Sequence, residues 1–175
     1  WISGKTRKGI KILDESAGSL TELNELGPII TASELSTILQ LIREELQSGD
    51  TLVLSGSIPR GVRLSIYAEL VQLARQIGAR AVVDADGELM KLAIEERPYL
   101  IKPNRFEAEQ LLQREIATER DAVYAAAQLT LRSEFVALTL GSHGAVLATE
   151  GRLIRVYPPR VSVKSTVGCG DVFLA

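Results

Sequence analysis

Short apolar runs alternate with amphipathic stretches along the whole chain, and this alternation predicts a mainly parallel β-sheet covered by helices. Four runs have the length and composition of buried central strands: 51–55 (TLVLS), 81–84 (AVVD), 99–102 (YLIK) and 135–140 (FVALTL). No low-complexity linker or internal repeat separates them. The pattern therefore favours a single α/β domain.

The amphipathic stretches predict five helices. The first is expected to begin near Ser33, because Thr31 and Glu34 have the spacing of a capping box, and the second is expected to end at Gly78. The apolar face is formed by Leu35, Ile38, Leu39, Ile42 and Leu46 in the first helix, and by Leu64, Tyr67, Ala68, Val71, Ala74 and Ile77 in the second. The other helices are expected at 88–95, after Pro103 and at 118–132.

Two segments predict strands of another kind. Residues 144–157 contain two apolar runs separated by Glu150 and Gly151, which is typical of a β-hairpin. Residues 9–13 (GIKIL) predict a strand of a smaller sheet that lies outside the main layer.

Composition and charge narrow the classes of partner. The net charge is −2, so nucleic acid is not an expected partner, and any local basic cluster should bind a small anion. Cys169 is the single cysteine, which excludes an internal disulfide framework and favours a cytoplasmic protein. No apolar run is long enough to cross a membrane, so no membrane association is expected. The chain begins at Trp1 and ends four residues after Asp171, as expected for a piece of a longer protein.

Polar and glycine-rich loops follow every predicted central strand. They are residues 55–61 (SGSIPRG), 84–87 (DADG), 102–107 (KPNRFE) and 139–144 (TLGSHG). Open parallel sheets bind their ligands beyond the carboxyl ends of the strands. These four loops are therefore expected to line one site.

A fifth segment, 165–171 (STVGCGD), has the composition of an anion site. Gly168 and Gly170 adopt backbone conformations closed to other residues, so successive N–H groups converge on one anion, and a helix that begins there adds its dipole. Asp171 then lies where it accepts a proton from an attacking hydroxyl. The alternative is an ordinary glycine turn capped by an aspartate.

Two familiar phosphate motifs do not match. Gly56 and Gly61 have the outer glycine spacing of a Walker A loop, but Val62 and Arg63 stand where lysine and serine or threonine are needed. Residues 168–170 resemble the start of a dinucleotide fingerprint, but Phe173 replaces its third glycine.

Taken together and in this order, SGSIPRG, DADGE, KPNRFE, TLGSHG and STVGCGD resemble the motifs of the ribokinase family (pfkB type) of carbohydrate kinases. The resemblance spans essentially all 175 residues. It implies a ribokinase-like three-layer α/β/α fold with a mainly parallel central sheet and a small accessory sheet that acts as a lid. Residues 1–30 would supply a lid strand and its return, and residues 31–175 the α/β core, of one kinase domain that is incomplete at both ends.

The resemblance also implies the catalytic roles. Asp171 corresponds to the base that deprotonates the sugar hydroxyl as it attacks the γ-phosphate of ATP. The N–H groups of Gly168, Cys169 and Gly170 would stabilise charge on the transferred phosphoryl group. Cys169 replaces the alanine usual in the family and is interpreted as a tolerated variant rather than a nucleophile.

The nucleotide and metal residues follow from the same resemblance. Asn104 and Glu107 correspond to the element that organises Mg²⁺ largely through water, and they also have the spacing of a capping box for the helix after Pro103. Lys102 would face the ATP phosphates; the alternative is a solvated lysine at the end of a strand. His143, the only histidine, is expected to be exposed and has no assigned role. The nucleotide-binding turn corresponds to Thr139, Gly141, Ser142 and Gly144.

For the sugar phosphate, the resemblance assigns Arg7, with Lys11 as a second cation, and the loop residues Gly56 and Ser57. Gly9 stands where the family has an asparagine. The backbone carbonyls of Ser165 and Val167 correspond to ligands of a monovalent cation such as K⁺.

The expected reaction is the ATP-dependent phosphorylation of a sugar phosphate. The segments GKTRKGIKI, TELNELGP and DADGE most resemble family members that convert fructose 1-phosphate to fructose 1,6-bisphosphate. The alternatives are tagatose 6-phosphate or fructose 6-phosphate as substrate, a sugar or nucleotide sensor without catalysis, and an inactive folded fragment. Family relatives often pair through the small sheet, so a homodimer is a further expectation.

Overall fold

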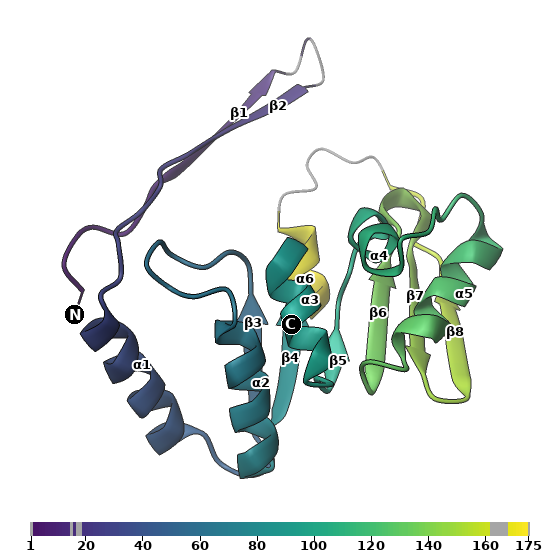
Figure 1. The fold of residues 1–175 in the computed structure, drawn as a ribbon. Coiled ribbons are helices and arrows are strands. Elements are labelled where there is room, and N and C mark those ends of the chain that lie inside the picture. Colours follow the sequence, from purple (N-terminus) through teal and green to yellow (C-terminus); the bar gives the residue numbers. More distant parts are fainter. Residues whose placement is uncertain (1, 15, 17–18, 162–167, 175) are drawn as a thin grey trace.

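A six-stranded sheet forms the centre of the computed structural model, which describes residues 2–14, 16, 19–161 and 168–174 (Figure 1). The strand order is β3-β4-β5-β6-β7-β8. The first four are parallel, and the last two add an antiparallel hairpin. The bounds are β3 (Thr51–Ser55), β4 (Arg80–Asp84), β5 (Leu100–Ile101), β6 (Phe135–Thr139), β7 (Ala145–Thr149) and β8 (Arg152–Val156). The mainly parallel sheet and the hairpin are confirmed.

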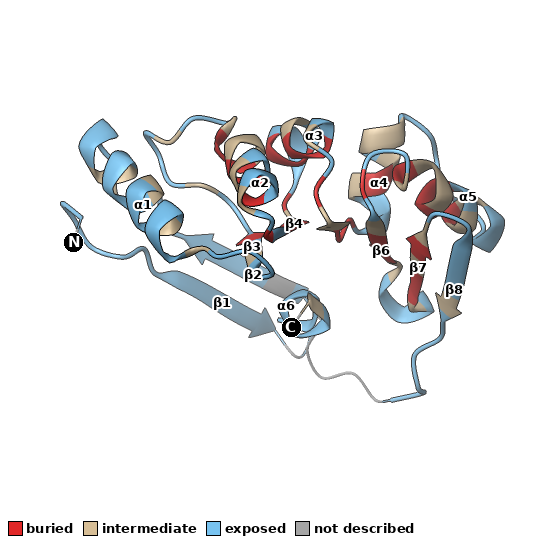
Figure 2. Ribbon diagram, turned by 90° about the horizontal axis from the view of Figure 1, so that it is seen from below, coloured by how far each residue is buried: buried red, intermediate tan, exposed pale blue. Residues whose placement is uncertain are grey.

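Helices lie on both sides of this sheet. Helices α2 to α5 cover one face, whereas α6 lies on the opposite side, so the expected three layers are present (Figure 2). The bounds are α1 (Ala32–Glu45), α2 (Ile66–Ile77), α3 (Gly87–Glu95), α4 (Arg105–Leu112), α5 (Glu119–Leu129) and α6 (Cys169–Leu174). Helices α2 to α5 form the covering layer, and α1 lies beside the β3 edge (Figures 1 and 2).

Capping boxes start three of the helices. In α1, the Thr31 hydroxyl accepts a hydrogen bond from the Glu34 N–H, and the Glu34 carboxylate accepts one from the Thr31 N–H. The same reciprocal pair precedes α4, at Asn104 and Glu107, and α5, at Thr118 and Asp121. Each box satisfies backbone donors that a helix start leaves free. The expected box of the first helix is thus confirmed.

The core lies between the covering helices and the middle of the sheet. Val83, Ile101, Leu138 and Val146, on four neighbouring strands, are each completely buried. Small residues of α5, among them Ala125 and Ala126, let that helix pack closely on β6 and β7.

The strand predicted at 51–55 is present as β3, but the prediction that it is central and buried differs from the structure. Among the described residues, β3 pairs only with β4 and lies at the edge of the sheet, and of its residues only Leu54 is buried. A strand at the edge of a sheet and a strand at its centre can have the same apolar composition. The number of neighbouring strands is set by the topology of the sheet and is not visible in the composition of one run. Residues 99–102 also form a shorter strand than expected, since β5 contains only Leu100 and Ile101.

Two apolar faces are less buried than their periodicity predicts. No residue of α1 is buried, although Leu35, Leu39 and Ile42 pack against the margin of the core. Leu64, which was expected in the second helix, precedes the first residue of α2 and is 52% exposed.

The helix expected at 118–132 ends at Leu129. Beyond it, the N–H groups of Leu131 and Arg132 donate to the carbonyls of Gln128 and Leu129, as in turns.

A two-stranded antiparallel sheet extends away from the core (Figure 1). It consists of β1 (Gly9–Asp14) and β2 (Ser19–Asn24), and every residue of β1 is exposed. This pair confirms the strand expected at 9–13 outside the main layer. Within the described residues, no helix is both long and apolar enough to cross a membrane.

Leu138 and Leu153 provide a test of where the core lies. Leu138 on β6 is completely buried, whereas Leu153 on β8 is 47% exposed. We expect Leu138→Ala to lower the free energy of unfolding by about 2–5 kcal/mol, because it leaves a cavity. Leu153→Ala should lower it by less than about 1 kcal/mol. Chemical denaturation of both variants measures the difference, and equal losses would contradict the assigned core.

Candidate active site

The carboxyl ends of the parallel strands are tied together by backbone hydrogen bonds. The Gly56 N–H donates to the Asp84 carbonyl (2.8 Å), the Lys102 N–H to the Val83 carbonyl (3.0 Å) and the Thr139 N–H to the Pro103 carbonyl (2.9 Å). The four loops that follow β3 to β6 therefore lie side by side at one edge of the sheet.

Lys102 lies at the centre of this edge and is only 7% exposed. Its Nζ is 2.9 Å from Asp84 Oδ1, so the ammonium and the carboxylate form an ion pair. A methyl group on Gly170 would lie 3.4 Å from the same Nζ. The lysine thus connects the ends of β4 and β5 with the glycine turn that precedes Asp171. The alternative of a solvated lysine at a strand end is wrong.

Asn104 and Glu107 form a compact pair at the start of α4. The Glu107 carboxylate accepts hydrogen bonds from the Asn104 backbone N–H (2.8 Å) and side-chain Nδ2 (2.6 Å), and Asn104 Oδ1 accepts one from the Glu107 N–H (3.0 Å). Burial, the largest effect, raises the pKa of Glu107, while the bond from Asn104 and the charge of Lys102 oppose the increase.

The acidic groups around Glu107 bear on its fit to a metal ion. The charges of Asp84 and Asp86 also raise the pKa of Glu107, so three carboxylates influence one another at this edge. No group of three or more histidine, cysteine, aspartate or glutamate side chains in the described residues has the geometry of a metal cluster. Because the oxygens of Asn104 and Glu107 already serve the capping box, the pair fits a Mg²⁺ ion that keeps its water shell better than one bound directly.

A pocket of about 430 Å³ lies between the hairpin and α6. The described residues that line it come from the expected nucleotide turn, from the segment after β8 and from the glycine turn with its helix: Thr139, Gly141, Gly144, Ala145, Val156, Tyr157, Pro158, Pro159, Cys169, Gly170 and Phe173. Two segments that the sequence motifs assign to nucleotide and phosphoryl binding therefore share one pocket. Ser142 and His143, from the same turn, are exposed.

The turn at 141–144 is shaped by a crowded glycine. Residues Gly141–His143 form a single 3₁₀ turn, and Gly144 follows with a φ of +88°. A methyl group at Gly144 would lie 2.1 Å from the carbonyl oxygen of Val156, which no arrangement of side chains could relieve. Glycine is required here by the backbone of the neighbouring strand.

Asp171 lies in the first turn of α6 and is exposed. The N–H groups of Cys169 and Gly170, in the same first turn, have no acceptor inside the helix. Gly168 precedes the helix with a φ of +78°, in the left-handed region. The turn thus has the open backbone donors that the motif predicts. Ser165 and Val167, expected to hold a monovalent cation, lie outside the described residues.

The residues expected to bind the sugar phosphate are less closely gathered. Gly56 is joined to Asp84 at the strand edge, and the Tyr67 hydroxyl donates to its carbonyl (3.2 Å). Lys11 lies on β1 and forms an ion pair with Glu22 (2.9 Å). Ser57 follows Gly56, whereas Lys11 belongs to the extended small sheet and Arg7 lies just before that sheet in the chain. Among the described residues, no recorded contact joins Arg7 or Lys11 to the strand edge.

Two residues of this region were given no role by sequence reasoning. Asp84 stands in the DADGE segment, but nothing in the sequence pairs it with Lys102, since the two are brought together only when β4 and β5 align. Arg155 on β8 binds backbone carbonyls around the 141–144 turn. In a strand of alternating apolar and polar residues, a single arginine is expected to face outward. The sequence pattern therefore does not indicate that Arg155 contacts the 141–144 turn.

Comparison with known proteins gives the site a context. The family model described as pfkB family carbohydrate kinase matches residues 2–175. A 1-phosphofructokinase of Rhodobacter capsulatus is 35% identical over 99% of this chain and 56% of its own length. A tagatose-6-phosphate kinase of Staphylococcus epidermidis is 32% identical over 99% of this chain and 57% of its own. The chain therefore spans little more than half the length of the relatives it matches.

Solved structures agree with this context. The tetrameric inhibited form of phosphofructokinase-2 from Escherichia coli superposes with a TM-score of 0.89 at 31% identity, covering 99% of this chain and 58% of its own. A second structure of that protein, in complex with potassium, gives the same TM-score and identity, and there the match covers 99% of this chain and 57% of its own.

Proposed function

The chain belongs to the pfkB family of carbohydrate kinases, and from that premise we propose that the intact protein transfers the γ-phosphoryl group of ATP to a sugar phosphate. The observation that carries the proposal is the arrangement around Lys102, a buried ammonium that lies between the Asp84 carboxylate and the glycine turn before Asp171. The preferred substrate is fructose 1-phosphate, and phosphorylation of its 6-hydroxyl gives fructose 1,6-bisphosphate. The similarity to a 1-phosphofructokinase supports this choice.

Each residue at the strand edge has a role in the proposed transfer. Asp171, exposed at the start of α6, accepts the proton of the attacking hydroxyl. The N–H groups of Gly168, Cys169 and Gly170 stabilise the charge on the transferred phosphoryl group. Lys102 has three N–H donors and uses one for Asp84, so it retains donors for phosphate oxygens of the nucleotide.

We assign the nucleotide to the 430 Å³ pocket, whose lining includes Thr139, Gly141 and Gly144; Ser142 lies exposed at its turn. Mg²⁺, when bound through water to Asn104 and Glu107, neutralises phosphate charge during the transfer. A monovalent cation near Ser165 and Val167 remains part of the proposal, supported by the potassium complex of the Escherichia coli relative. ATP is a cytoplasmic substrate, and we place the protein in that compartment.

Asn24 supports the assignment of the small sheet to the sugar phosphate. Asn24 lies on β2, directly opposite Gly9 on β1. The family has an asparagine at the position of Gly9. A methyl group on Gly9 would lie 2.9 Å from Oδ1 of Asn24. An amide therefore reaches the same place from the neighbouring strand. Arg7 and Lys11, together with Ser57 from the loop after β3, complete the proposed phosphate-binding group. We propose that Asn24 takes the part of the asparagine that Gly9 replaces.

Asp171→Asn tests the catalytic base in the intact protein. We expect kcat to fall by about 100- to 10,000-fold, because the amide cannot accept the proton, while ATP still binds. Glu150→Gln, the same change at the exposed hairpin turn, is the matched control and should leave kcat unchanged. Coupled measurement of ADP release and calorimetry of ATP binding give the two quantities. Near-normal turnover by Asp171→Asn would remove Asp171 from the role of base.

A substrate panel tests the choice of sugar phosphate. We expect kcat/KM for fructose 1-phosphate to exceed that for tagatose 6-phosphate and fructose 6-phosphate by about tenfold or more, because the phosphate-binding group fixes the position of the reacting hydroxyl. A higher value for either competitor would reassign the substrate. ATP binding without sugar-dependent ADP release from any of the three would identify a nucleotide sensor instead.

We also propose that two copies pair through the small sheet. Ile10 and Ile12 on β1, with Leu23 on β2, lie on one face and are each more than half exposed, whereas Lys11 and Glu22 lie on the other, together with the exposed Leu13. An exposed apolar face of this kind is typical of a protein interface. The face with Ile10, Ile12 and Leu23 would then meet the second copy and leave the opposite face, with Asn24 and Lys11, to the sugar phosphate.

Ile10→Glu tests this pairing. A charge in the apolar face should lower the mass measured by sedimentation equilibrium to that of one chain, because an unpaired carboxylate would be buried in the interface. Leu131→Glu, at an exposed leucine (67%) after α5, is the control and should leave the mass unchanged. An unchanged oligomer in the Ile10 variant would exclude this surface.

A further inference from the structure

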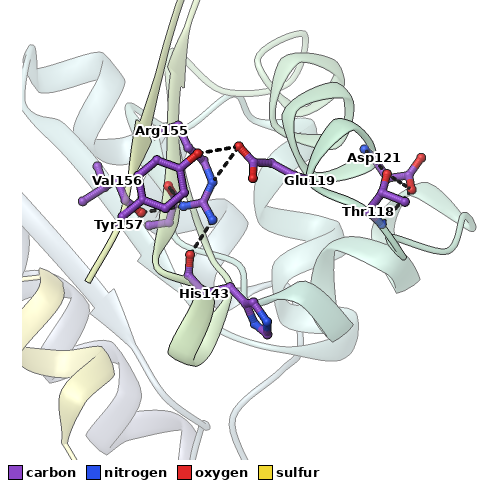
Figure 3. Close-up of polar contacts among 8 residues, drawn as sticks. Thr118, Glu119, Asp121, His143, Arg155, Val156 and Tyr157 are labelled. Carbon is purple, nitrogen blue, oxygen red and sulfur yellow. Dashed lines mark hydrogen bonds and ion pairs between the residues drawn. The ribbon is translucent and has the colours of Figure 1, made fainter. Parts of the chain in front are cut away.

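The guanidinium of Arg155 lies against the 141–144 turn and is largely enclosed, with 15% of the side chain exposed (Figure 3). Its Nη2 donates to the carbonyl of His143, and its Nη1 donates to the carbonyls of Ala145 (3.0 Å) and Val156. The first two carbonyls lie on either side of Gly144. One side chain thus binds the backbone immediately before and immediately after Gly144.

Two neighbouring side chains hold the guanidinium in place. Its Cζ lies 4.3 Å from the centre of the Tyr157 ring, a cation–π distance. The Tyr157 hydroxyl donates to Glu119 Oε1 (2.7 Å), and the same oxygen lies 3.5 Å from Arg155 Nε. Glu119 is the first residue of α5, so a helix, a strand and the segment after β8 meet at this arginine (Figure 3).

The internal hydrogen bonds of the turn do not attach it to the rest of the sheet. The Leu140 N–H donates to the Gly144 carbonyl (2.7 Å), and the Gly144 N–H donates to the Gly141 carbonyl (3.0 Å). Both bonds join residues of the turn and its approach. The bond from Arg155 to the His143 carbonyl is different, because it connects the turn to β8, and hydrogen bonds from a charged donor are stronger than those between neutral groups.

The space around the turn leaves little alternative to this arrangement. A methyl group on Gly144 would lie 3.1 Å from Arg155 Nη1, as well as 2.1 Å from the Val156 carbonyl oxygen. The guanidinium therefore fills the gap between Gly144 and β8. Without it, the carbonyl of the buried Ala145 would lose a donor, and the carbonyl of the exposed His143 would lose its bond to β8.

We propose that Arg155 is a positioning residue for the nucleotide. It acts by fixing the 141–144 turn at the pocket between the hairpin and α6. The inference rests on the proposed function, because it takes the nucleotide to bind in that pocket. Arg155 does not line the pocket, whereas Gly141, Gly144, Val156 and Tyr157 do. It acts on the ligand through the backbone that it holds, and it reduces the cost of ordering the turn when the nucleotide binds.

Arg155→Met in the intact protein tests the proposal. The variant removes every donor and keeps an apolar side chain of comparable length. We expect KM for ATP to rise about tenfold, because the turn must now be ordered by the nucleotide itself. KM for the sugar phosphate should stay within about twofold of its original value, since no bond of Arg155 reaches the small sheet.

Arg152→Met is the matched control. Arg152 lies on the same strand, is exposed, and has no recorded side-chain hydrogen bond or ion pair within the described part of the chain. It should change neither KM. A folded Arg155→Met protein with an unchanged KM for ATP would overturn the proposal. If Arg155→Met does not fold, Arg155→Lys takes its place in the experiment. A single ammonium reaches fewer carbonyls than a guanidinium, so we expect KM for ATP to rise about threefold. An unchanged KM for ATP in Arg155→Lys would overturn the proposal.

Amide hydrogen exchange of residues 139–146 tests the hold on the turn without any nucleotide. In Arg155→Met, these amides should exchange at least about tenfold faster, because the turn opens more often; unchanged exchange would overturn the proposal. The measurement also separates two kinds of failure. If the unaltered protein binds no ATP, the proposed function fails, while the exchange rates still decide whether Arg155 fixes the turn.

Discussion

Lys102 and Asp84 form an ion pair that is largely removed from water, at the carboxyl ends of two adjacent parallel strands. A buried charge is costly unless an opposite charge accompanies it, so each partner fixes the position of the other. Because Lys102 also approaches Gly170, the pair sets the distance between the strand edge and the glycine turn. The other loops are attached to this centre by backbone hydrogen bonds from Gly56 and Thr139.

The parts of the fold that the sequence predicts well are those that depend on neighbours in the chain. The capping box of Thr31 and Glu34 is an example, since both partners lie within one helical turn. The hairpin around Gly151 is another, because its turn residues and its apolar alternation are read together. The loops after the strands were also identified, because glycine and polar residues interrupt each apolar run.

The parts that the sequence does not predict depend on alignment between distant segments. β3 has the composition of a central strand, but it has a single neighbour among the described strands and so lies at the edge of the sheet. Lys102 looks like a solvated lysine until β4 brings Asp84 beside it. Arg155 alternates like any outward residue of a strand, and only the hairpin places it against the His143 carbonyl. Each of these properties is set by the order of the strands or by their register, and neither is encoded by one chain segment alone.

Asn104 and Glu107 form the capping box that begins α4, and the oxygens that make its hydrogen bonds are the ones we propose to hold the water shell of Mg²⁺. This overlap affects what genetic data on the family can reveal. Under the proposal, a substitution at either position would destabilise the start of a helix and alter the surroundings of the ion at once. Natural selection for a stable helix would keep both residues even in a member that had lost catalysis. Sequence conservation at this pair is therefore weak evidence of activity.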